Sequence, residues 1–285
     1  MTVRVVTDSS AVMPAEWVDR YGIHVVSLEL AWPDGTLSRG DVPYSVVAER
    51  LAAGAHRSER PPTTGAPSPG TYESIFDRAL ASGERVVVLC PSAELSSTYR
   101  SALLAARALD SSEDVRVIDT QTAAAGQSIV VYQAARAAAA GRDLDAVVER
   151  ALSVSRRTQI WATLMQLEFL RRSGRVPAIA ALGAGALRLQ PIVRYTQGSP
   201  SLVGVVRSVR SGYERIFREW ERTFVGSTPL LFVAFHSARA AEADDARARV
   251  LERVPAADAI AIEVPAALAA HTGPGLIGFA WLWDN

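Results

Sequence analysis

Hydroxyl side chains gather directly after one apolar segment of this chain. Residues 86–90 read Val-Val-Val-Leu-Cys, and Ser96, Ser97 and Thr98 follow in a short loop before a helical pattern begins. The start of a helix presents unpaired backbone N–H groups and a partial positive charge, which together form an anion site. The three hydroxyl groups add donors there without a charged side chain. The segment therefore predicts an anion-binding loop, with capping of the helix by Ser96 as the alternative role.

Three further loops share this polar character. Residues 7–10, 63–68 and 118–122 all carry hydroxyl groups, and two of these loops directly follow strand-like segments. Loops at the carboxyl ends of parallel strands hold the ligand in open α/β sheets, so we expect these loops to converge on one rim. Asp8 and Asp119 are predicted to brace their own loops through local hydrogen bonds.

A fifth loop contains a histidine in a glycine-rich setting. Residues 271–275 read His-Thr-Gly-Pro-Gly, and two glycines with a proline impose an unusual backbone that approaches a ligand closely. An imidazole has a pKa near neutrality, so His271 is a candidate to bind or protonate an anion. His24, His56 and His236 lack such a setting and are predicted to be structural.

The elements that must position these loops alternate between strand and helix in the first half of the chain. This alternation requires crossover connections and predicts a mostly parallel sheet flanked by helices. The predicted strands are Val3–Thr7, Ile23–Leu30, Val86–Cys90 and Val115–Ile118, and the predicted helices are Pro43–Ala53, Thr71–Ala81, Ser96–Ala106 and Ala123–Ala140. The polar segment His56–Gly70 is predicted to be an ordered loop or a lid.

The second half of the chain predicts a different arrangement. Helices are expected at Leu144–Val154 and Ala162–Arg172, and a pattern of strands and two helices follows. The later strands are Pro191–Tyr195, Ser201–Val206, Leu230–Phe235, Ala259–Val264 and Leu276–Trp283, with helices at Ser208–Phe224 and Ala238–Val254. We therefore expect an α/β protein of two domains, residues 1–158 and 159–285, the second with a mixed sheet.

Composition excludes several classes of function. The chain has 285 residues, and its 30 Lys and Arg residues balance 30 Asp and Glu residues, so no net field attracts nucleic acid or an anionic membrane. All the basic residues are arginine, which excludes a P-loop lysine and a pyridoxal-phosphate Schiff base. Cys90 is the only cysteine, so disulfides within the chain and cysteine-based metal clusters are excluded, and we expect no metal site.

The N-terminus shows no targeting signal. Residues 1–7 lack a basic stretch followed by a long apolar core, and no window is long and uncharged enough for a transmembrane helix. These features predict a cytoplasmic protein.

Eight short motifs follow one another from residue 3 to about residue 280. Their order and spacing resemble the DegV family of fatty-acid-binding proteins. The motifs lie at residues 6–11, 64–68, 95–102, 117–119, 170–175, 187–192, 206–208 and 271–275.

The resemblance implies a two-domain α/β protein with one long-chain fatty acid in an apolar tunnel between the domains. In the family, two hydroxyl groups and a histidine hold the acyl carboxylate, at positions that correspond to Thr64, Ser96 and His271. We expect such neutral donors, rather than an arginine clamp, to hold the anion. The resemblance also implies supporting loops that contain Ser97, Thr98, Gly174, Arg175, Thr272 and Gly273.

The resemblance further implies a partner. Better-known bacterial members present their fatty acid to a separate ATP-dependent kinase subunit of the dihydroxyacetone-kinase type, which forms an acyl phosphate. On this reading the chain is a lipid-binding protein with no catalytic residue and no cofactor besides the bound fatty acid. Arg207 corresponds to a family arginine on the surface implicated in the handover.

The chain departs from the family pattern at several positions. Gly65 and Ala66 replace Ser-Gln, Ser97 replaces a glycine, Ser173 replaces the first glycine of Gly-Gly-Arg, and Gln190 replaces a lysine. These changes leave Thr64, Ser96 and His271 intact, but they bear on the shape of the pocket and on docking of a kinase.

Two other functions are compatible with the same residues. A serine-dependent acyl hydrolase would use Ser96 and His271 as nucleophile and base. A binding subunit for a small polar molecule of the dihydroxyacetone type would use the hydroxyl-lined rim. The second alternative predicts a small polar cavity, whereas fatty-acid binding predicts a long apolar one.

Overall fold

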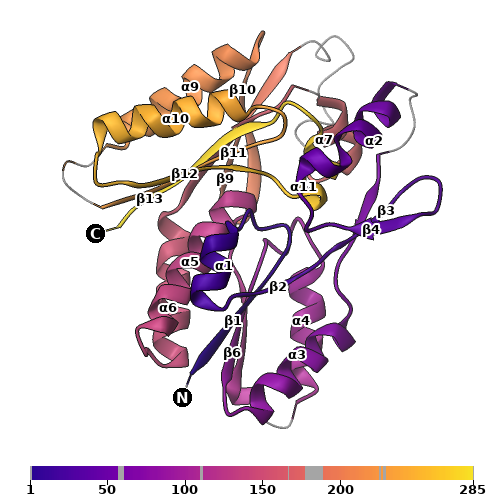
Figure 1. Ribbon diagram of the computed structural model, residues 1–285, viewed down its shortest axis with the longest axis vertical. Helices are drawn as coiled ribbons and strands as arrows, with labels where there is room; N and C mark the ends of the chain where they lie inside the picture. The colour runs from indigo at the N-terminus through magenta and orange to yellow at the C-terminus, as the bar shows by residue number, and fades with distance from the viewer. Residues whose placement is uncertain are drawn as a thin grey trace.

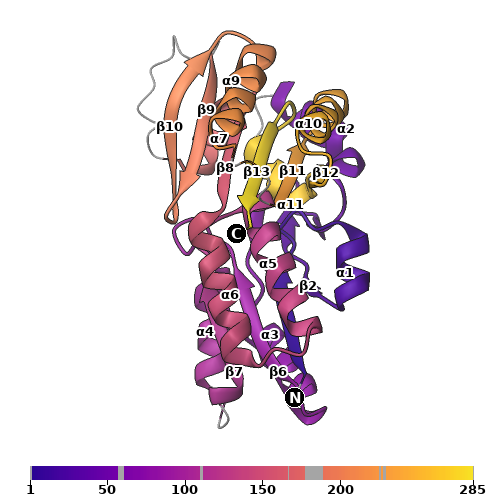
Figure 2. The same ribbon diagram turned by 90° about the vertical axis from the view of Figure 1, so that its left-hand side faces the viewer.

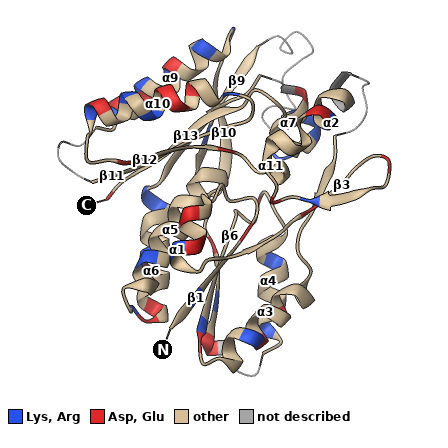
Figure 3. Cartoon of the chain, in the orientation of Figure 1, with Lys and Arg blue, Asp and Glu red and all other residues tan. Residues whose placement is uncertain are grey.

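In the part of the chain that the structure describes, three β-sheets organise the computed structural model, and helices pack around the two larger sheets (Figure 1). The structure describes residues 2–56, 61–109, 112–165, 167–176, 189–224, 226 and 229–284. Charged residues of both signs lie mainly on helices and connections (Figure 3). Leu187, which belongs to one of the eight motifs, lies outside the described residues.

The N-terminal sheet has four parallel strands in the order β2-β1-β6-β7. Their bounds are β1 Val3–Asp8, β2 His24–Val26, β6 Arg85–Cys90 and β7 Val115–Asp119, and a 3₁₀ turn, η1 Ser112–Asp114, precedes β7. Strand β6 is buried almost throughout, as expected of a parallel strand that helices cover on both faces. Because the strands are parallel, the loops after β1, β6 and β7 meet at one edge of the sheet.

Helices cover both faces of this sheet. One face carries α3 (Pro69–Ala81) and α4 (Thr98–Arg107), and the other carries α5 (Ala124–Ala139) and α6 (Leu144–Arg157), with α1 (Ala15–Tyr21) against α5. Helix α5 is buried on nearly every side because it also contacts the C-terminal sheet. None of the described helices is long and apolar enough to cross a membrane.

The C-terminal sheet is mixed and has the order β10-β9-β8-β13-β11-β12. Its strands are β8 Gln159–Thr163, β9 Gln190–Thr196, β10 Ser199–Val206, β11 Leu230–His236, β12 Asp258–Glu263 and β13 Ile277–Trp283. Helices α9 (Val209–Arg222) and α10 (Ala240–Arg253) bury an aromatic core against one face. The other face turns toward α5 and the N-terminal half of the chain, which Figure 2 shows below it.

A small antiparallel sheet connects the two halves of the chain. It has the order β4-β3-β5, and α2, α7 and α11 lie near it. The bounds are β3 Glu29–Ala31, β4 Leu37–Arg39, β5 Thr63–Gly65, α2 Tyr44–His56, α7 Leu167–Ser173 and α11 Ala266–Thr272. Helix α11, from the end of the chain, contacts β3, β5 and α2 from its beginning. This contact brings residues around 64 and 271 together.

The predicted fold class is confirmed, but three predicted segments differ from the structure. The predicted loop His56–Gly70 contains strand β5, and its residues 57–60 lie outside the described residues. The segment Ile23–Leu30 forms no continuous strand: β2 pairs with β1, whereas β3 pairs with β4 and β5. The chain changes sheets at Leu28, whose backbone N–H donates to the Ser9 hydroxyl. The predicted helix from Ala162 begins only at Leu167. Ala162 itself lies in strand β8, where it pairs with β9 and lines the cavity.

One position in the sequence divides the strands of the N-terminal sheet from those of the C-terminal sheet. Thr158 ends α6, and β8 begins at the next residue. We propose residues 1–158 and 159–285 as the two domains, because every strand of the N-terminal sheet precedes this position and every strand of the C-terminal sheet follows it.

Candidate fatty-acid site

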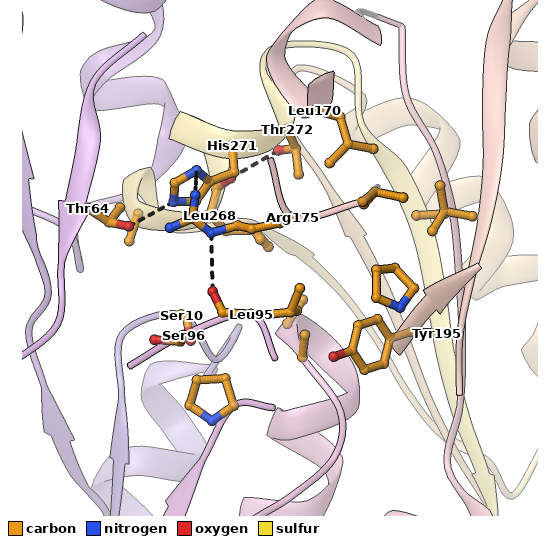
Figure 4. Close-up of a pocket in the computed structure, with 18 of the residues that line it drawn as sticks. Ser10, Thr64, Leu95, Ser96, Leu170, Arg175, Tyr195, Leu268, His271 and Thr272 are labelled. Atoms are coloured by element: carbon orange, nitrogen blue, oxygen red, sulfur yellow. Dashed lines mark hydrogen bonds between the residues drawn. The ribbon is translucent and has the colours of Figure 1, made fainter. Parts of the chain in front are cut away.

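A cavity of about 220 Å³ lies between the N-terminal loops, α11 and the inner face of the C-terminal sheet. Apolar side chains form most of its wall, among them Ile160, Val193, Tyr195, Phe235, Leu268 and Leu276. Polar side chains are fewer, and the labelled ones other than Tyr195 lie toward one side in Figure 4. The cavity therefore has an apolar body with a polar end, which suits an amphipathic ligand.

Thr64 and His271 meet at the polar end. The Thr64 Oγ1 atom lies 2.8 Å from Nε2 of His271, although the two residues are 207 positions apart. Pairing of β5 with β3 positions Thr64, and the last turn of α11 positions His271. Gly273 ends this helix with φ +68°, and a Cβ there would stand 2.6 Å from the Phe169 ring. Only glycine fits between the helix end and that ring.

Arg175 contacts the opposite side of the imidazole. Its Nη1 atom lies 3.3 Å from Nδ1 of His271, and its guanidinium also donates to the carbonyls of Ser173 and Leu95, at 2.9 and 3.2 Å. A guanidinium only donates, so Nδ1 accepts, and Nε2 of the neutral ring carries the hydrogen. His271 therefore donates to Thr64, and the hydrogen of the Thr64 hydroxyl remains available to another acceptor.

The imidazole of His271 is neutral at physiological pH. Burial lowers its pKa to about 3, and the positive charge of Arg175 acts in the same direction. The expectation of a pKa near neutrality is therefore wrong. Burial also lowers the pKa of Arg175.

Ser96 lies on the same cavity and is held by Thr98. Its Oγ accepts the Thr98 backbone N–H at 3.2 Å and lies 3.0 Å from the Thr98 hydroxyl. Helix α4 begins at Thr98, two residues later than predicted, and Ser97 precedes it without a side-chain cap. Ser96 and Ser97 line the cavity, whereas Thr98 is fully buried behind them. Ser96 thus braces the helix start and also faces the cavity.

Asp8 and Asp119 brace their loops, as expected. Asp8 Oδ1 accepts the backbone N–H and the hydroxyl of Ser10 at 3.0 and 2.5 Å, and burial raises the pKa of Asp8. Asp119 Oδ1 accepts the Gln121 N–H at 2.8 Å. Ser10 itself lines the cavity. Sequence reasoning did not select it, although its place after β1 was a usable signal.

The remaining candidate residues divide into two groups. Arg175 and Thr272 line the cavity, and the Thr272 hydroxyl donates to the Leu268 carbonyl at 3.2 Å. Gly174 and Gly273 shape the adjoining backbone without lining the cavity. Arg207 is exposed in the connection between β10 and α9, also away from the lining.

A second pocket lies on the outer side of the polar end. It has a volume of about 600 Å³, and both His271 and Arg175 line it as well as the inner cavity. Arg172, Ser173, Thr63 and two prolines complete its wall. A cation, Arg175, therefore lines both spaces, and the neutral donor set stays a prediction. In the part of the chain that the structure describes, no group of three or more His, Cys, Asp or Glu side chains could hold a metal ion.

Comparisons with known proteins agree on one family. The family model described as "Uncharacterised protein, DegV family" matches residues 2–284. A DegV domain-containing protein of Streptomyces coelicolor is 34% identical over 278 residues, covering 97% of this chain and 96% of that protein.

Solved structures show the same fold. A Thermus thermophilus DegV family protein, described by its fatty acid binding, has a TM-score of 0.89 and 29% identity over 99% of this chain and 100% of its own. Bacillus subtilis DegV, described as a fatty acid binding protein, has a TM-score of 0.88 and 20% identity over the full length of both chains. The chain belongs to the DegV family.

Proposed function

We propose that this protein binds one long-chain fatty acid in the cavity, with the carboxylate held by the Thr64 and Ser96 hydroxyls and with His271 acting on it through Thr64. The observation that carries the proposal is the distribution of polarity along the cavity, whose wall is mostly apolar and whose labelled polar side chains other than Tyr195 lie toward one side. The fatty acid binding ascribed to the Thermus thermophilus relative supports the same ligand class.

Hydrogen-bond directions suit a carboxylate at the polar end. His271 donates to Thr64, so the Thr64 hydroxyl has a hydrogen to give to an anion. The Ser96 oxygen already accepts a backbone N–H, and its own hydrogen can turn from Thr98 to the ligand. Both groups thus act as donors, which a carboxylate requires.

The acyl tail supplies most of the affinity. Burial of about sixteen methylenes at roughly 0.8 kcal/mol each gives on the order of 13 kcal/mol before the cost of association. The head group therefore needs orientation more than tight binding. Arg175 is consistent with this, because its Nε and Nη1 atoms already contact two carbonyls and the imidazole.

We further propose that a separate ATP-dependent kinase subunit of the dihydroxyacetone-kinase type phosphorylates the bound carboxylate. The outer pocket supports this role, since among the described residues only His271 and Arg175 line both it and the inner cavity. A phosphoryl donor docked there would face the carboxylate across these two side chains. The chain contains no lysine, which fits a protein that leaves nucleotide handling to a partner. Arg207 lies on the exposed surface that we assign to docking.

The geometry does not favour a serine hydrolase. No hydrogen bond between described residues joins Ser96 to His271, and the Ser96 hydroxyl contacts Thr98 instead. Nucleophilic catalysis needs a base within hydrogen-bond reach of the serine. The largely apolar wall likewise disfavours a small polar ligand.

Mass spectrometry of organic extracts from the denatured protein tests the ligand. We expect about one long-chain acyl group per chain, or stoichiometric uptake of added palmitate by delipidated protein. Failure to detect either would refute the proposal.

Trapping with hydroxylamine tests the partner. Palmitate-loaded protein with ATP alone should give no hydroxamate, and addition of a dihydroxyacetone-kinase-type subunit from the same organism should give palmitoyl hydroxamate. Acyl phosphate formation without the kinase subunit would contradict the assignment.

A further inference from the structure

One aromatic side chain faces the polar end from across the cavity. Figure 4 shows Thr64, His271 and Arg175 on one side and Tyr195 on the other. A carboxylate bound beside Thr64 and His271 directs the acyl tail toward Tyr195. The following argument therefore rests on the proposed function.

Tyr195 belongs to a row of bulky side chains across three strands. It pairs with Ile160 of β8 and with Pro200 of β10, and all three line the cavity. The neighbouring row contains Val193, Ala162 and Gly278, and the ring of Phe235, which pairs with Gly278, lies so close that a Cβ on this glycine would stand 2.3 Å from it. The small side chain of Ala162 thus leaves room for a tail between Val193 and Phe235, beside the row that contains Tyr195.

Hydrogen bonds hold the Tyr195 ring in place from both halves of the chain. The Tyr195 hydroxyl donates to the Gly198 carbonyl, which also accepts the buried Ser92 hydroxyl at 2.6 Å. The Gly198 N–H donates in turn to the Gln121 carbonyl at 2.9 Å. The turn between β9 and β10 is therefore fastened to the N-terminal domain, and the ring cannot yield without breaking this contact.

These bonds also determine what the ring offers to a ligand. The Tyr195 hydroxyl is already occupied and the residue is only 7% exposed, so it presents carbon atoms to the cavity rather than a free donor. A methyl terminus fits against such a surface, whereas a second polar group would lose its hydrogen bonds there.

We propose that the Tyr195 ring limits the length of the acyl chain that this protein accepts. A chain that reaches the ring fills the cavity, and a longer one must either displace the fastened turn or withdraw its carboxylate from Thr64. Either event lowers the affinity, so fatty acids above a definite chain length are not bound well.

The test compares the acyl chains that three variants select from an equimolar mixture of saturated C12 to C22 fatty acids. Tyr195→Ala opens space behind the end of the tail, so its longest well-bound chain should exceed that of the wild type by about two carbons or more. Tyr195→Phe keeps the ring and loses only the hydroxyl, so the chain-length limit should stay unchanged even where thermal stability falls. Leu268→Ala is the matched control, because it removes volume beside His271 at the other end.

Mass spectrometry after gel filtration gives both the occupancy and the chain-length distribution. An identical distribution in the wild type and Tyr195→Ala, with both proteins loaded, would overturn the proposal while leaving fatty-acid binding intact. The same shift in Leu268→Ala would also overturn it, because the limit would then reflect total volume. A wild type that takes up no fatty acid would refute the proposed function itself. If Tyr195→Ala does not fold, Tyr195→Leu replaces it with the same expected direction.

Discussion

The guanidinium of Arg175 lies 3.3 Å from Nδ1 of His271, and this contact leaves the Thr64 hydroxyl free to donate its hydrogen to a ligand. Because arginine only donates, the imidazole must accept at Nδ1 and donate at Nε2, where Thr64 Oγ1 lies 2.8 Å away. The three residues form a chain of donors that ends on the Thr64 hydroxyl. A buried cation thus acts on the head group through a neutral imidazole.

Replacement of Thr64 by valine preserves the side-chain shape and removes the hydroxyl. We expect palmitate affinity to fall roughly 10- to 100-fold, as a lost hydrogen bond to a charged group costs about 1.5–3 kcal/mol. Displacement of a fluorescent fatty acid measures this change. Thr63→Val is the matched control, since Thr63 is exposed and lines only the outer pocket. Equal loss of affinity for methyl palmitate, which has no carboxylate, would show that Thr64 acts on the tail instead.

Removal of the Arg175 charge should raise the pKa of His271. In Arg175→Gln the electrostatic contribution disappears while burial remains, so the pKa should exceed that of the wild type and still lie below 6.5. An NMR titration of the imidazole nitrogens in delipidated protein gives both values. Arg172→Gln serves as the control, because Arg172 pairs with Glu168 and is no cause of the His271 shift. An unchanged pKa in Arg175→Gln would contradict the contact.

The burial of His271 makes the stability of the delipidated protein depend on pH. Between pH 6.5 and about pH 3 the unfolded chain binds a proton at this residue and the folded chain does not. The free energy of unfolding should therefore fall as the pH decreases, by up to about 1.4 kcal/mol per pH unit from this residue alone. Urea denaturation at pH 7, 6 and 5 should show a shallower decline for His271→Gln. Asp8, whose pKa burial raises, has the opposite influence but is present in both proteins. Parallel pH profiles would show that His271 titrates normally.

Gly273 is predicted to be irreplaceable for a packing reason. An alanine Cβ would stand 2.6 Å from the Phe169 ring and displace α7, so Gly273→Ala should lower the free energy of unfolding by about 2–4 kcal/mol and weaken fatty-acid binding. Gly141→Ala also places a side chain at a positive φ, +76° against +68°, with no atom within 4 Å of the added carbon. The control should lose only about 1 kcal/mol. Equal losses in the two variants would mean that backbone strain alone explains the glycine.

Sequence patterns predicted the part of the site that is built from loops at one edge of the parallel sheet. Ser96 follows β6, and parallel strands bring such loops together, so the position of Ser96 on the cavity followed from the strand pattern. His271 was a candidate from its glycine-rich setting, but its grouping with Thr64 came from the family resemblance, because no local pattern shows that β5 and α11 pack together.

The contacts of Arg175 were beyond sequence reasoning. They connect residues 80 and 96 positions apart, and hydrophobic periodicity reports local faces rather than such pairings. The division of Ile23–Leu30 between two sheets also could not be predicted, since both parts have the composition of a strand and only long-range pairing separates them. The pKa of His271 likewise depends on burial that only the tertiary fold creates.

A crystal structure of the protein with palmitate tests the assignment of the cavity most directly. The predicted result is a carboxylate within hydrogen-bond distance of the Thr64 and Ser96 hydroxyls, with the tail running past Val193 toward Tyr195. A carboxylate bound beside Tyr195, or palmitate bound outside this cavity, would contradict it.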